Sequence, residues 1–367
     1  MIKIVHLTSV HKMLDPRIFL KECITLKNNG YDVTIVAPYD RDVCIEGVNI
    51  KAVQHPQNRF NRMTKTIYNV YKTARRERAN LYHFHDPELI IIGLLLKCEG
   101  KKVIYDIHED VPNLILEKEW IGPYPLRKFI SMIMTALEKI AARTFNAIVT
   151  VTPEIASRFL PAKTIILRNY VSLRYIDEID LQSIEKSRPV VIFHGTISKT
   201  RGIKEIIQSI GQLKGQAELW LFGKWANQEL QKECSSLEGW QYTNYFGRKD
   251  ITEIYGYLKL ADIGLHILYN LPHYKGGSAT KAFEYMACSI PFITTDNPRN
   301  REIYEGCSLY VNPMDASDIV DKITKLLNSD QLRQEMGQRG RQLAETRFSW
   351  EKESEKLIEL YNRVMRE

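Results

Sequence analysis

Residues 273–296 read HYKGGSATKAFEYMACSIPFITTD, a loop, a helix and a strand in sequence. A glycine pair and a serine lead into a helical pattern, which gives way to a run rich in β-branched residues. Inside the expected helix, Lys281 and Glu284 are three residues apart and therefore lie on one face. This order is typical of α/β proteins, in which loops after parallel strands carry the functional groups.

Short β-branched runs alternate with helical patterns along the rest of the chain as well. One series runs from IKIVHLT to TIILRN and a second from PVVIFHG to LYVN. This alternation predicts parallel sheets covered on both faces. We therefore expect two doubly wound, Rossmann-like domains at 1–170 and 189–345, joined by a polar linker at 171–188. The last helix, 346–367, is amphipathic and can pack back on the N-terminal domain.

Length and composition agree with this organisation. The 367 residues are too many for one ordinary core, and 44% hydrophobic with 26% charged residues is typical of a globular protein. A net charge of +7 favours anionic partners but does not choose among nucleic acid, anionic lipid and a phosphorylated substrate.

Several features predict a cytoplasmic protein. The longest apolar run, 89–96, is too short to span a bilayer, and the first residues enter a strand pattern without a signal-peptide layout. The six cysteines form no C-x-x-C pair, which argues against a cysteine zinc site or a disulfide framework and fits a reducing compartment.

Five loops after expected strands carry polar residues that the fold does not need. They are the opening stretch and four loops with His11, Asp15 and Arg17; His83, His85, Asp86 and Glu88; Asp106, His108, Glu109 and Asp110; and His194, Lys199 and Arg201. Because such loops leave the same end of parallel strands, each half should gather its own cluster, and the two clusters can meet across a cleft.

We expect no catalytic metal. His83 and His85 are expected to point to opposite faces of their strand, so they would not ligate one ion together, and His108 with Asp110 is a weak pair. For His83 we expect a core histidine bonded to backbone.

Phosphate-binding signatures of other enzyme classes are absent. Gly195 and Gly202 bracket Lys199 and Arg201 ahead of a helix, but neither G-x-G-x-x-G nor G-x-x-x-x-G-K-[ST] follows the first strand of either half. A dinucleotide oxidoreductase and a P-loop NTPase are therefore disfavoured.

The opening stretch has the groups that a sugar nucleotide requires. Gly276 and Gly277 permit close approach of backbone, and Ser278 is a natural N-cap. The first-turn amides and Lys281 would attract a diphosphate, and Glu284, one turn deeper, can accept hydrogen bonds from ribose hydroxyls. The alternative is a capped helix with a solvated Lys281 and a Glu284 paired to a neighbour.

These segments resemble the group 1, or family 4, glycosyltransferases, which have the GT-B fold. KAFEYMACSIPFITTD is similar to that family's K-x-x-E-Y-M-A-x-G-x-P-V-I pattern. The first loop, with D-P-R, together with YHFHDPELI, VIYDIHEDVP and FSWEKESEKLIELY, resembles one branch of the family.

The resemblance implies retaining transfer of a sugar from a nucleotide donor without a divalent metal. It implies Glu284 on the donor ribose, the amides of Gly277, Ser278 and Ala279 on the diphosphate, and Arg201 as the cation of the family's K-G pair. It also implies His108 at the donor sugar, and Gly247 with Arg248 beside the base, for which we expect uridine.

Two departures from the family pattern remain. The first glutamate of the family's E-x7-E motif falls on Gly276, so the sugar cannot be carried over. The arginine that often follows the glycine of F-x-G-R is Thr196, and Lys199 or Lys281 can supply its charge.

The reaction leaves an alternative open. Arg201 and Lys281 would stabilise the leaving diphosphate, with front-face attack giving retention. Asp86 or Glu109 as general base would instead make the enzyme inverting. We place His11, Asp15, Arg17, His85 and Asp86 on the acceptor side of the N-terminal domain.

The acceptor is expected to be a saccharide or a lipid-linked saccharide. Two amphipathic helical patterns, RFNRMTKTIYNVYKTARRER and LRKFISMIMTALEKIAARTF, carry basic faces that can touch anionic membrane. We expect their apolar stripes to pack on the sheet.

Surface polysaccharide or glycolipid synthesis is the leading functional interpretation. The alternatives are a sugar-nucleotide epimerase or a phosphorylase, which share two facing α/β domains, and a non-catalytic basic module for lipid or nucleic acid. Donor turnover without an acceptor would indicate the epimerase, and salt-dependent binding without donor binding would indicate the module.

Overall fold

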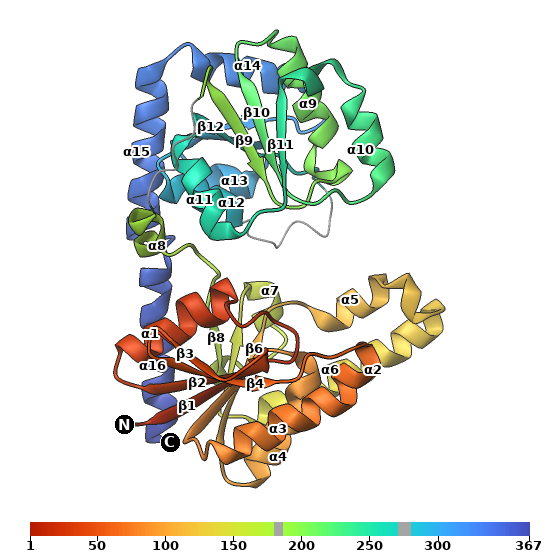
Figure 1. Cartoon of the computed structure of the whole chain (residues 1–367), viewed down its shortest axis with the longest axis vertical. Coiled ribbons are helices and arrows are strands. Elements are labelled where there is room, and N and C mark those ends of the chain that lie inside the picture. Colours follow the sequence, from red (N-terminus) through yellow and green to blue (C-terminus); the bar gives the residue numbers. More distant parts are fainter. Residues whose placement is uncertain (180–185, 271–279) are drawn as a thin grey trace. The chain divides into compact units, whose positions relative to one another are not determined.

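The computed structural model describes residues 1–179, 186–270 and 280–367, which form two compact units (Figure 1). The first unit comprises Met1–Asn169 together with Glu353–Glu367, and the second comprises Tyr170–Lys352. Each unit contains one sheet with helices on both faces. The expected class, two doubly wound α/β domains, is confirmed.

The sheet of the first unit has the strand order β3-β4-β2-β1-β5-β6-β7-β8. All neighbours are parallel except β3 and β4, an antiparallel edge pair that the sequence pattern did not indicate. The strands are β1 (Lys3–Leu7), β2 (Asp32–Pro38), β3 (Val43–Ile45), β4 (Val48–Val53), β5 (Leu81–Phe84), β6 (Lys102–Ile107), β7 (Ala147–Thr150) and β8 (Thr164–Ile166).

Strand alternation gives the two faces of this sheet different coverings. Val5 and Leu7 of β1 belong to a core built with α3, α4 and α6, so His6 between them points to the opposite face. Up to Asn169, the helical elements of the unit are η1 (a π-helical segment, Pro16–Cys23), α1 (Ile24–Asn28), α2 (Arg59–Asn61), η2 (Arg62–Thr66), α3 (Ile67–Arg76), η3 (Pro87–Leu89), α4 (Ile90–Cys98), α5 (Val111–Glu117), η4 (Glu119–Ile121), α6 (Tyr124–Thr144), α7 (Pro153–Ala156) and η5 (Pro161–Lys163).

The C-terminal helix α16 (Trp350–Arg366) belongs in large part to the first unit. Its residues Leu357, Leu360, Tyr361 and Val364 are buried at the spacing of one helix face. The expectation that this helix packs back on the N-terminal domain is therefore confirmed.

The sheet of the second unit is entirely parallel, with the order β11-β10-β9-β12-β13-β14. Its strands are β9 (Val190–His194), β10 (Glu218–Phe222), β11 (Thr243–Gly247), β12 (Ile263–His266), β13 (Phe292–Thr295) and β14 (Ser308–Val311). Its helices are α8 (Leu173–Glu178), α9 (Ile203–Gln212), α10 (Gln228–Ser235), α11 (Ile251–Leu260), α12 (Thr280–Ala287), α13 (Pro298–Ile303), α14 (Ala316–Leu327) and α15 (Asp330–Thr346).

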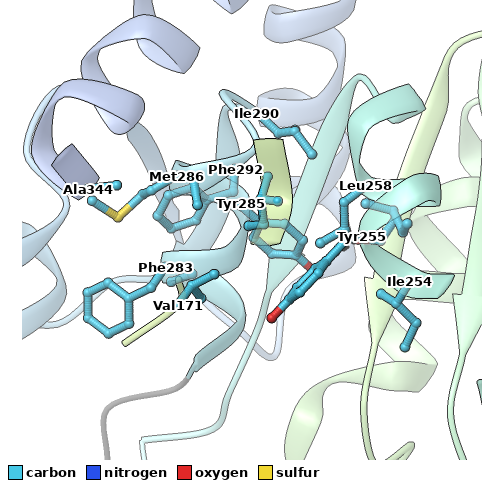
Figure 2. Packing of buried hydrophobic residues seen from close by; sticks show 14 of the residues in the cluster. Val171, Ile254, Tyr255, Leu258, Phe283, Tyr285, Met286, Ile290, Phe292 and Ala344 are labelled. Atoms are coloured by element: carbon cyan, nitrogen blue, oxygen red, sulfur yellow. Dashed lines mark hydrogen bonds between the residues drawn. The ribbon is translucent and has the colours of Figure 1, made fainter. Parts of the chain in front are cut away.

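Helix α12 lies in the middle of the second unit's core, where Figure 2 shows Phe283, Tyr285 and Met286 among residues of α11, β13 and α15. The Tyr285 hydroxyl lies 3.3 Å from the carbonyl oxygen of Ile192 in β9 and 3.1 Å from that of Leu265 in β12. Both are within hydrogen-bond distance. This contact ties the helix to the two central strands.

The segment expected to be a linker, 171–188, begins with core residues. Leu173 and Ile176 of α8 are buried in the same hydrophobic cluster as α12. Their apolar side chains, spaced three apart on one helix face, fix this start of the segment to the second unit.

We predict that Tyr285→Phe lowers the free energy of unfolding of the second unit by about 1–2 kcal/mol, because two buried carbonyls lose a hydrogen-bond donor. Urea unfolding followed by tryptophan fluorescence measures this change. Tyr68→Phe, at a position 60% exposed, is the control and should change stability little. Equal stability of the Tyr285→Phe variant and the wild type would contradict the prediction.

Candidate active site

Both sheets reverse their strand order at one place, and ligands of doubly wound sheets bind at the carboxyl ends of the strands there. In the first unit this switch point lies between β1 and β5, and in the second between β9 and β12. Most of the candidate residues from the sequence lie in the loops after these strands or after β6, or in helix α12.

Two cations converge at the carboxyl end of β9. Gly195, directly after the strand, has φ +108°, and a Cβ there would lie 2.8 Å from Lys281 Cε and 3.2 Å from Arg201 Nη1. Any larger residue would strain this backbone and collide with the Lys281 side chain. The glycine therefore lets a side chain of α12 and one of the β9–α9 loop approach the same backbone.

Lys281 is buried, so the alternative of a solvated lysine is wrong. Its Nζ lies 3.8 Å from the centre of the Phe193 ring, a cation–π distance. Burial, followed by repulsion from Arg201, holds the pKa of Lys281 well below its ordinary value, and the charge of Glu284 only partly opposes this. An anion bound between Lys281 and Arg201 would reduce this repulsion.

Glu284 is buried next to His194, with 3.1 Å between Glu284 Oε2 and His194 Nε2. Burial and the two cations also lower the pKa of His266, at the end of β12, to about 3, so its ring is neutral and lies 3.0 Å from Thr294 Oγ1. Sequence reasoning missed His266, although its position at the end of a central strand could have indicated it.

The remaining donor-side candidates are distributed around this cluster. Lys199 begins a short 3₁₀ turn, Lys199–Arg201, and lines a surface hollow with Asn227 and Glu229. Gly247 ends β11, and Arg248 after it is exposed. Gly276, Gly277, Ser278 and Ala279 lie outside the described residues.

In the first unit, Arg17 holds a buried charge network. Its Nε and Nη2 donate to the Asp106 carboxylate at 3.0 and 3.1 Å, and its Nη1 donates to the carbonyl oxygen of Leu167. Burial acts against the charge of Asp106, but Arg17 and then His108 hold the pKa of Asp106 well below its usual range. His108 Nε2 lies 3.0 Å from Asp106 Oδ2. Asp106 thus orients the half-buried His108.

A second network shapes the loop after β1. His11 Nδ1 lies 3.2 Å from Asp15 Oδ2, and His11 Nε2 lies 3.4 Å from Asp86 Oδ1. Burial acts against the charge of His11, but these carboxylates raise its pKa above the ordinary value. Asp86 also accepts hydrogen bonds from Thr8 Oγ1 and from the amide of Ser9. These bonds join the β1 and β5 loops.

The other candidate of the β6 loop is Glu109, which is exposed. Its neighbour Asp110 caps α5 by accepting from the amide of Asn113 and pairs with Arg158 at 2.8 Å. Asp110 therefore has a structural role in this loop.

The expectation for His83 and His85 is wrong. Residues two apart in a strand point to the same face, and their ring centres are only 4.7 Å apart. His83 Nδ1 is bonded to the Tyr361 hydroxyl at 2.7 Å, not to backbone. Sequence reasoning also missed His6 and Glu22, which lie beside these rings.

The apolar stripes of the two amphipathic helices pack only in part on the sheet. Val70 and Ala74 of α3 are buried as expected, but Phe60, ahead of them, is 75% exposed. On α6, Phe129 and Met132 are exposed whereas Ala141 and Ala142 are buried in the core, so the expectation of core packing is wrong for the first part of this helix and holds for its end.

We predict that Arg17→Met destabilises the first unit by about 3–5 kcal/mol, because Asp106 and Glu22 then remain buried without their cation. Chemical unfolding measures the change. Lys51→Met removes an exposed pair with Asp42 in the same unit and should cost less than about 1 kcal/mol. Similar losses in the two variants would refute the central role of Arg17.

Comparisons with solved structures agree with this architecture. The chain resembles sucrose-phosphate synthase from Thermosynechococcus elongatus, with a TM-score of 0.74, 14% identity and 99% of both chains covered. It also resembles HepE from Anabaena in complex with UDP and glucose, with a TM-score of 0.72, 14% identity, and 99% of this chain and 100% of that chain covered. Both likenesses concern the fold, which is GT-B.

Curated relatives match about half of the chain, and the chain spans about half of their length. The N,N'-diacetylbacillosaminyl-diphospho-undecaprenol alpha-1,3-N-acetylgalactosaminyltransferase of Campylobacter jejuni is 27% identical over 191 residues, 49% of this chain and 46% of that protein. The capsular polysaccharide biosynthesis glycosyltransferase CapM of Staphylococcus aureus is 26% identical over 183 residues, 48% of this chain and 47% of that protein.

Two family models match, one in each half. The model described as Glycosyltransferase Family 4 matches residues 20–164, and the model described as Glycosyl transferases group 1 matches residues 177–343. Together they cover most of the sequence, so the chain belongs to the group 1, or family 4, glycosyltransferases.

Proposed function

We propose that this chain transfers a sugar from a nucleotide donor, a UDP-sugar, to a saccharide or lipid-linked acceptor with retention of configuration. The observation that carries the proposal is the convergence of Arg201 and Lys281, with Glu284 one turn along α12, at the carboxyl end of β9.

The charges of this cluster suit a nucleoside diphosphate. Burial and, after it, repulsion from Arg201 make the charged form of Lys281 unfavourable and lower its pKa. A diphosphate would offset the repulsion and, with Lys281 buried, would act on it with little screening. Glu284 supplies a carboxylate that can accept from vicinal ribose hydroxyls.

The same cations would assist the chemistry. As the bond between the anomeric carbon and the leaving phosphate oxygen breaks, negative charge grows on the diphosphate, where Arg201 and Lys281 already lie. The acceptor hydroxyl attacks on the same face and gives its proton to the leaving phosphate oxygen, which yields retention. No divalent metal is then required to hold the donor.

His108 is proposed to contact the donor sugar, with Asp106 and Arg17 fixing its ring. Asp86 is committed to hydrogen bonds with Thr8 and Ser9 of the β1 loop, which favours a positioning role over that of a general base. Glu109 is exposed and is therefore the candidate general base in the alternative, inverting mechanism.

The relatives support uridine and a polysaccharide setting. HepE has been solved with UDP, CapM is named for capsular polysaccharide biosynthesis, and the name of the Campylobacter protein contains a diphospho-undecaprenol acceptor. We infer a lipid-linked or saccharide acceptor in surface polysaccharide or glycolipid synthesis for this chain.

A lipid-linked acceptor would require contact with a membrane, and the first unit has a suitable surface. Phe60, Trp120, Phe129 and Met132 are exposed, and the guanidinium of Arg59 lies 3.8 Å over the Trp120 ring. Basic residues flank them: Arg59, Arg62, Lys118, Arg127 and Lys128.

Exposed aromatic and apolar side chains next to cations are typical of binding at an anionic bilayer. No described helix is long and apolar enough to cross a bilayer. We therefore infer peripheral attachment at the cytoplasmic face.

Donor binding is tested with Lys281→Met and with Lys204→Met as the matched control, since Lys204 is a lysine of the same unit paired with Glu233 at the surface. We expect UDP to raise the melting temperature of the wild type and of Lys204→Met. Lys281→Met should bind UDP at least about 10-fold more weakly, because a charge-assisted contact of roughly 1.5–3 kcal/mol is lost. Calorimetric titration gives the affinities.

The same measurements are repeated with GDP and with ADP in place of UDP. Binding of another nucleotide with the same loss in Lys281→Met would replace uridine and keep the site. No binding by any nucleotide would refute the transferase proposal and favour the non-catalytic basic module.

Membrane attachment is tested by flotation with vesicles containing anionic phosphatidylglycerol. Met132→Glu should bind these vesicles less than the wild type, because it removes apolar area and adds a negative charge. Met314→Glu changes an equally exposed methionine in the second unit and should bind like the wild type. Equal binding by both variants would refute this surface.

A further inference from the structure

The face of the first sheet covered by η1 and α16 holds a group of buried residues of which only His85 was placed on the acceptor side. His6 of β1 and His83 of β5 are in register on neighbouring parallel strands, and His85 follows two residues later. All three therefore point to one face. Glu22 reaches them from η1, and all four residues are buried.

The four side chains offer ligand atoms within 4.8 Å of one another. His6 Nδ1 lies 3.0 Å from His85 Nε2, and Glu22 Oε2 lies 4.0 Å from His85 Nε2. His83 Nδ1 is bonded to the Tyr361 hydroxyl, so His83 would bind the ion through Nε2. In a tetrahedral zinc site with bonds of roughly 2.0 Å, ligand atoms lie about 3.3 Å apart. This value lies between the observed spacings of 3.0 Å and 4.0 Å.

Among the described residues, two members of this group have buried polar atoms without a hydrogen bond. Neither oxygen of Glu22 nor Nε2 of His83 makes a hydrogen bond within the described part of the chain, although Arg17 Nε pairs with Glu22 Oε1 at 3.0 Å. Buried polar atoms are nearly always satisfied, so Glu22 Oε2 and His83 Nε2 need a partner. Glu22 and Asp106 also share the single guanidinium of Arg17, so the second carboxylate charge must be balanced by a proton or by another cation.

We propose that His6, Glu22, His83 and His85 form a buried site for a divalent transition metal, with zinc as the best fit. Three imidazoles and one carboxylate are borderline ligands of the kind that zinc takes. With four protein ligands the coordination is closed, so the ion is structural and supplies no open position for substrate.

Neighbouring residues would orient these ligands. The other ring nitrogen of His85, Nδ1, lies 3.5 Å from Asp106 Oδ2 and 3.3 Å from His108 Nε2. The Tyr361 hydroxyl lies 3.2 Å from His6 Nε2. Carboxylate and hydroxyl partners of this kind fix the ring orientation of metal-bound histidines. The metal would thereby couple α16 and the β6 loop to the two central strands.

The wild-type protein provides the first test. Full-length protein is stripped with chelator and titrated with Co²⁺, whose visible d–d absorption reports four-coordinate binding, and separately with Zn²⁺ in a thermal scan. We expect one ion per chain, the tetrahedral spectrum, and a rise in melting temperature of roughly 5–10 °C at 100 times the dissociation constant. No spectrum and no thermal shift would overturn the site and leave a proton on Glu22, shared with Asp106, as the explanation.

Variants locate the ion. Glu22→Gln and His83→Asn should lose the d–d absorption and the zinc-dependent shift, whereas His55→Asn, a histidine exposed near Asp40, should keep both. Retention of the bound ion by Glu22→Gln and His83→Asn would place it elsewhere and refute the proposal. If a variant does not fold, the stoichiometry and spectrum of the wild type still decide the outcome.

Discussion

The candidate site of the second unit depends on two basic side chains held close together, of which Lys281 is buried and Arg201 half-buried. Lys281 and Arg201 meet beside Gly195, and water cannot screen the lysine as it would at the surface. Two contacts partly offset the free-energy cost of burying this ammonium group: it lies over the Phe193 ring, and the Glu284 carboxylate lies on the same helix. In the proposed function, a bound anion would relieve the repulsion between these two side chains and favour the charged form of Lys281.

The position of these cations follows from the parallel sheet. Central strands β9 and β12 end side by side, and α12 is fixed above them by the Tyr285 hydroxyl and by the core packing in Figure 2. Buried apolar positions around Tyr285 leave Lys281 and Glu284 little freedom, so their geometry is set by the core. The first unit uses the same principle, with Arg17 and Asp106 fixing the loops after β1, β5 and β6.

Much of this could be predicted from the sequence. Periodicity gave the parallel strands and their order along the chain, and the K-x-x-E-Y-M-A segment indicated the family. The burial of individual side chains was harder to predict, because it depends on which other elements pack against each face of a helix or strand. Lys281 was expected to bind the diphosphate or, in the alternative, to be solvated, and the apolar stripe with Phe129 was expected in the core; the structure buries Lys281 and exposes Phe129. The error for His83 and His85 was one of strand geometry, since alternate residues share a face.

The register between strands is a second property that periodicity does not supply. His6 and His83 are 77 positions apart in the sequence, and only the pairing of β1 with β5 brings them together. Glu22 and Tyr361 then reach the same face from two helical elements at opposite ends of the chain. A cluster built from four distant segments leaves no local motif in the sequence.

The most direct test of the account is a crystal structure of the protein with UDP. The account predicts that the diphosphate lies within hydrogen-bond distance of Lys281 Nζ and the Arg201 guanidinium, with the ribose hydroxyls on Glu284. A diphosphate bound elsewhere, with these three side chains unchanged, would contradict it.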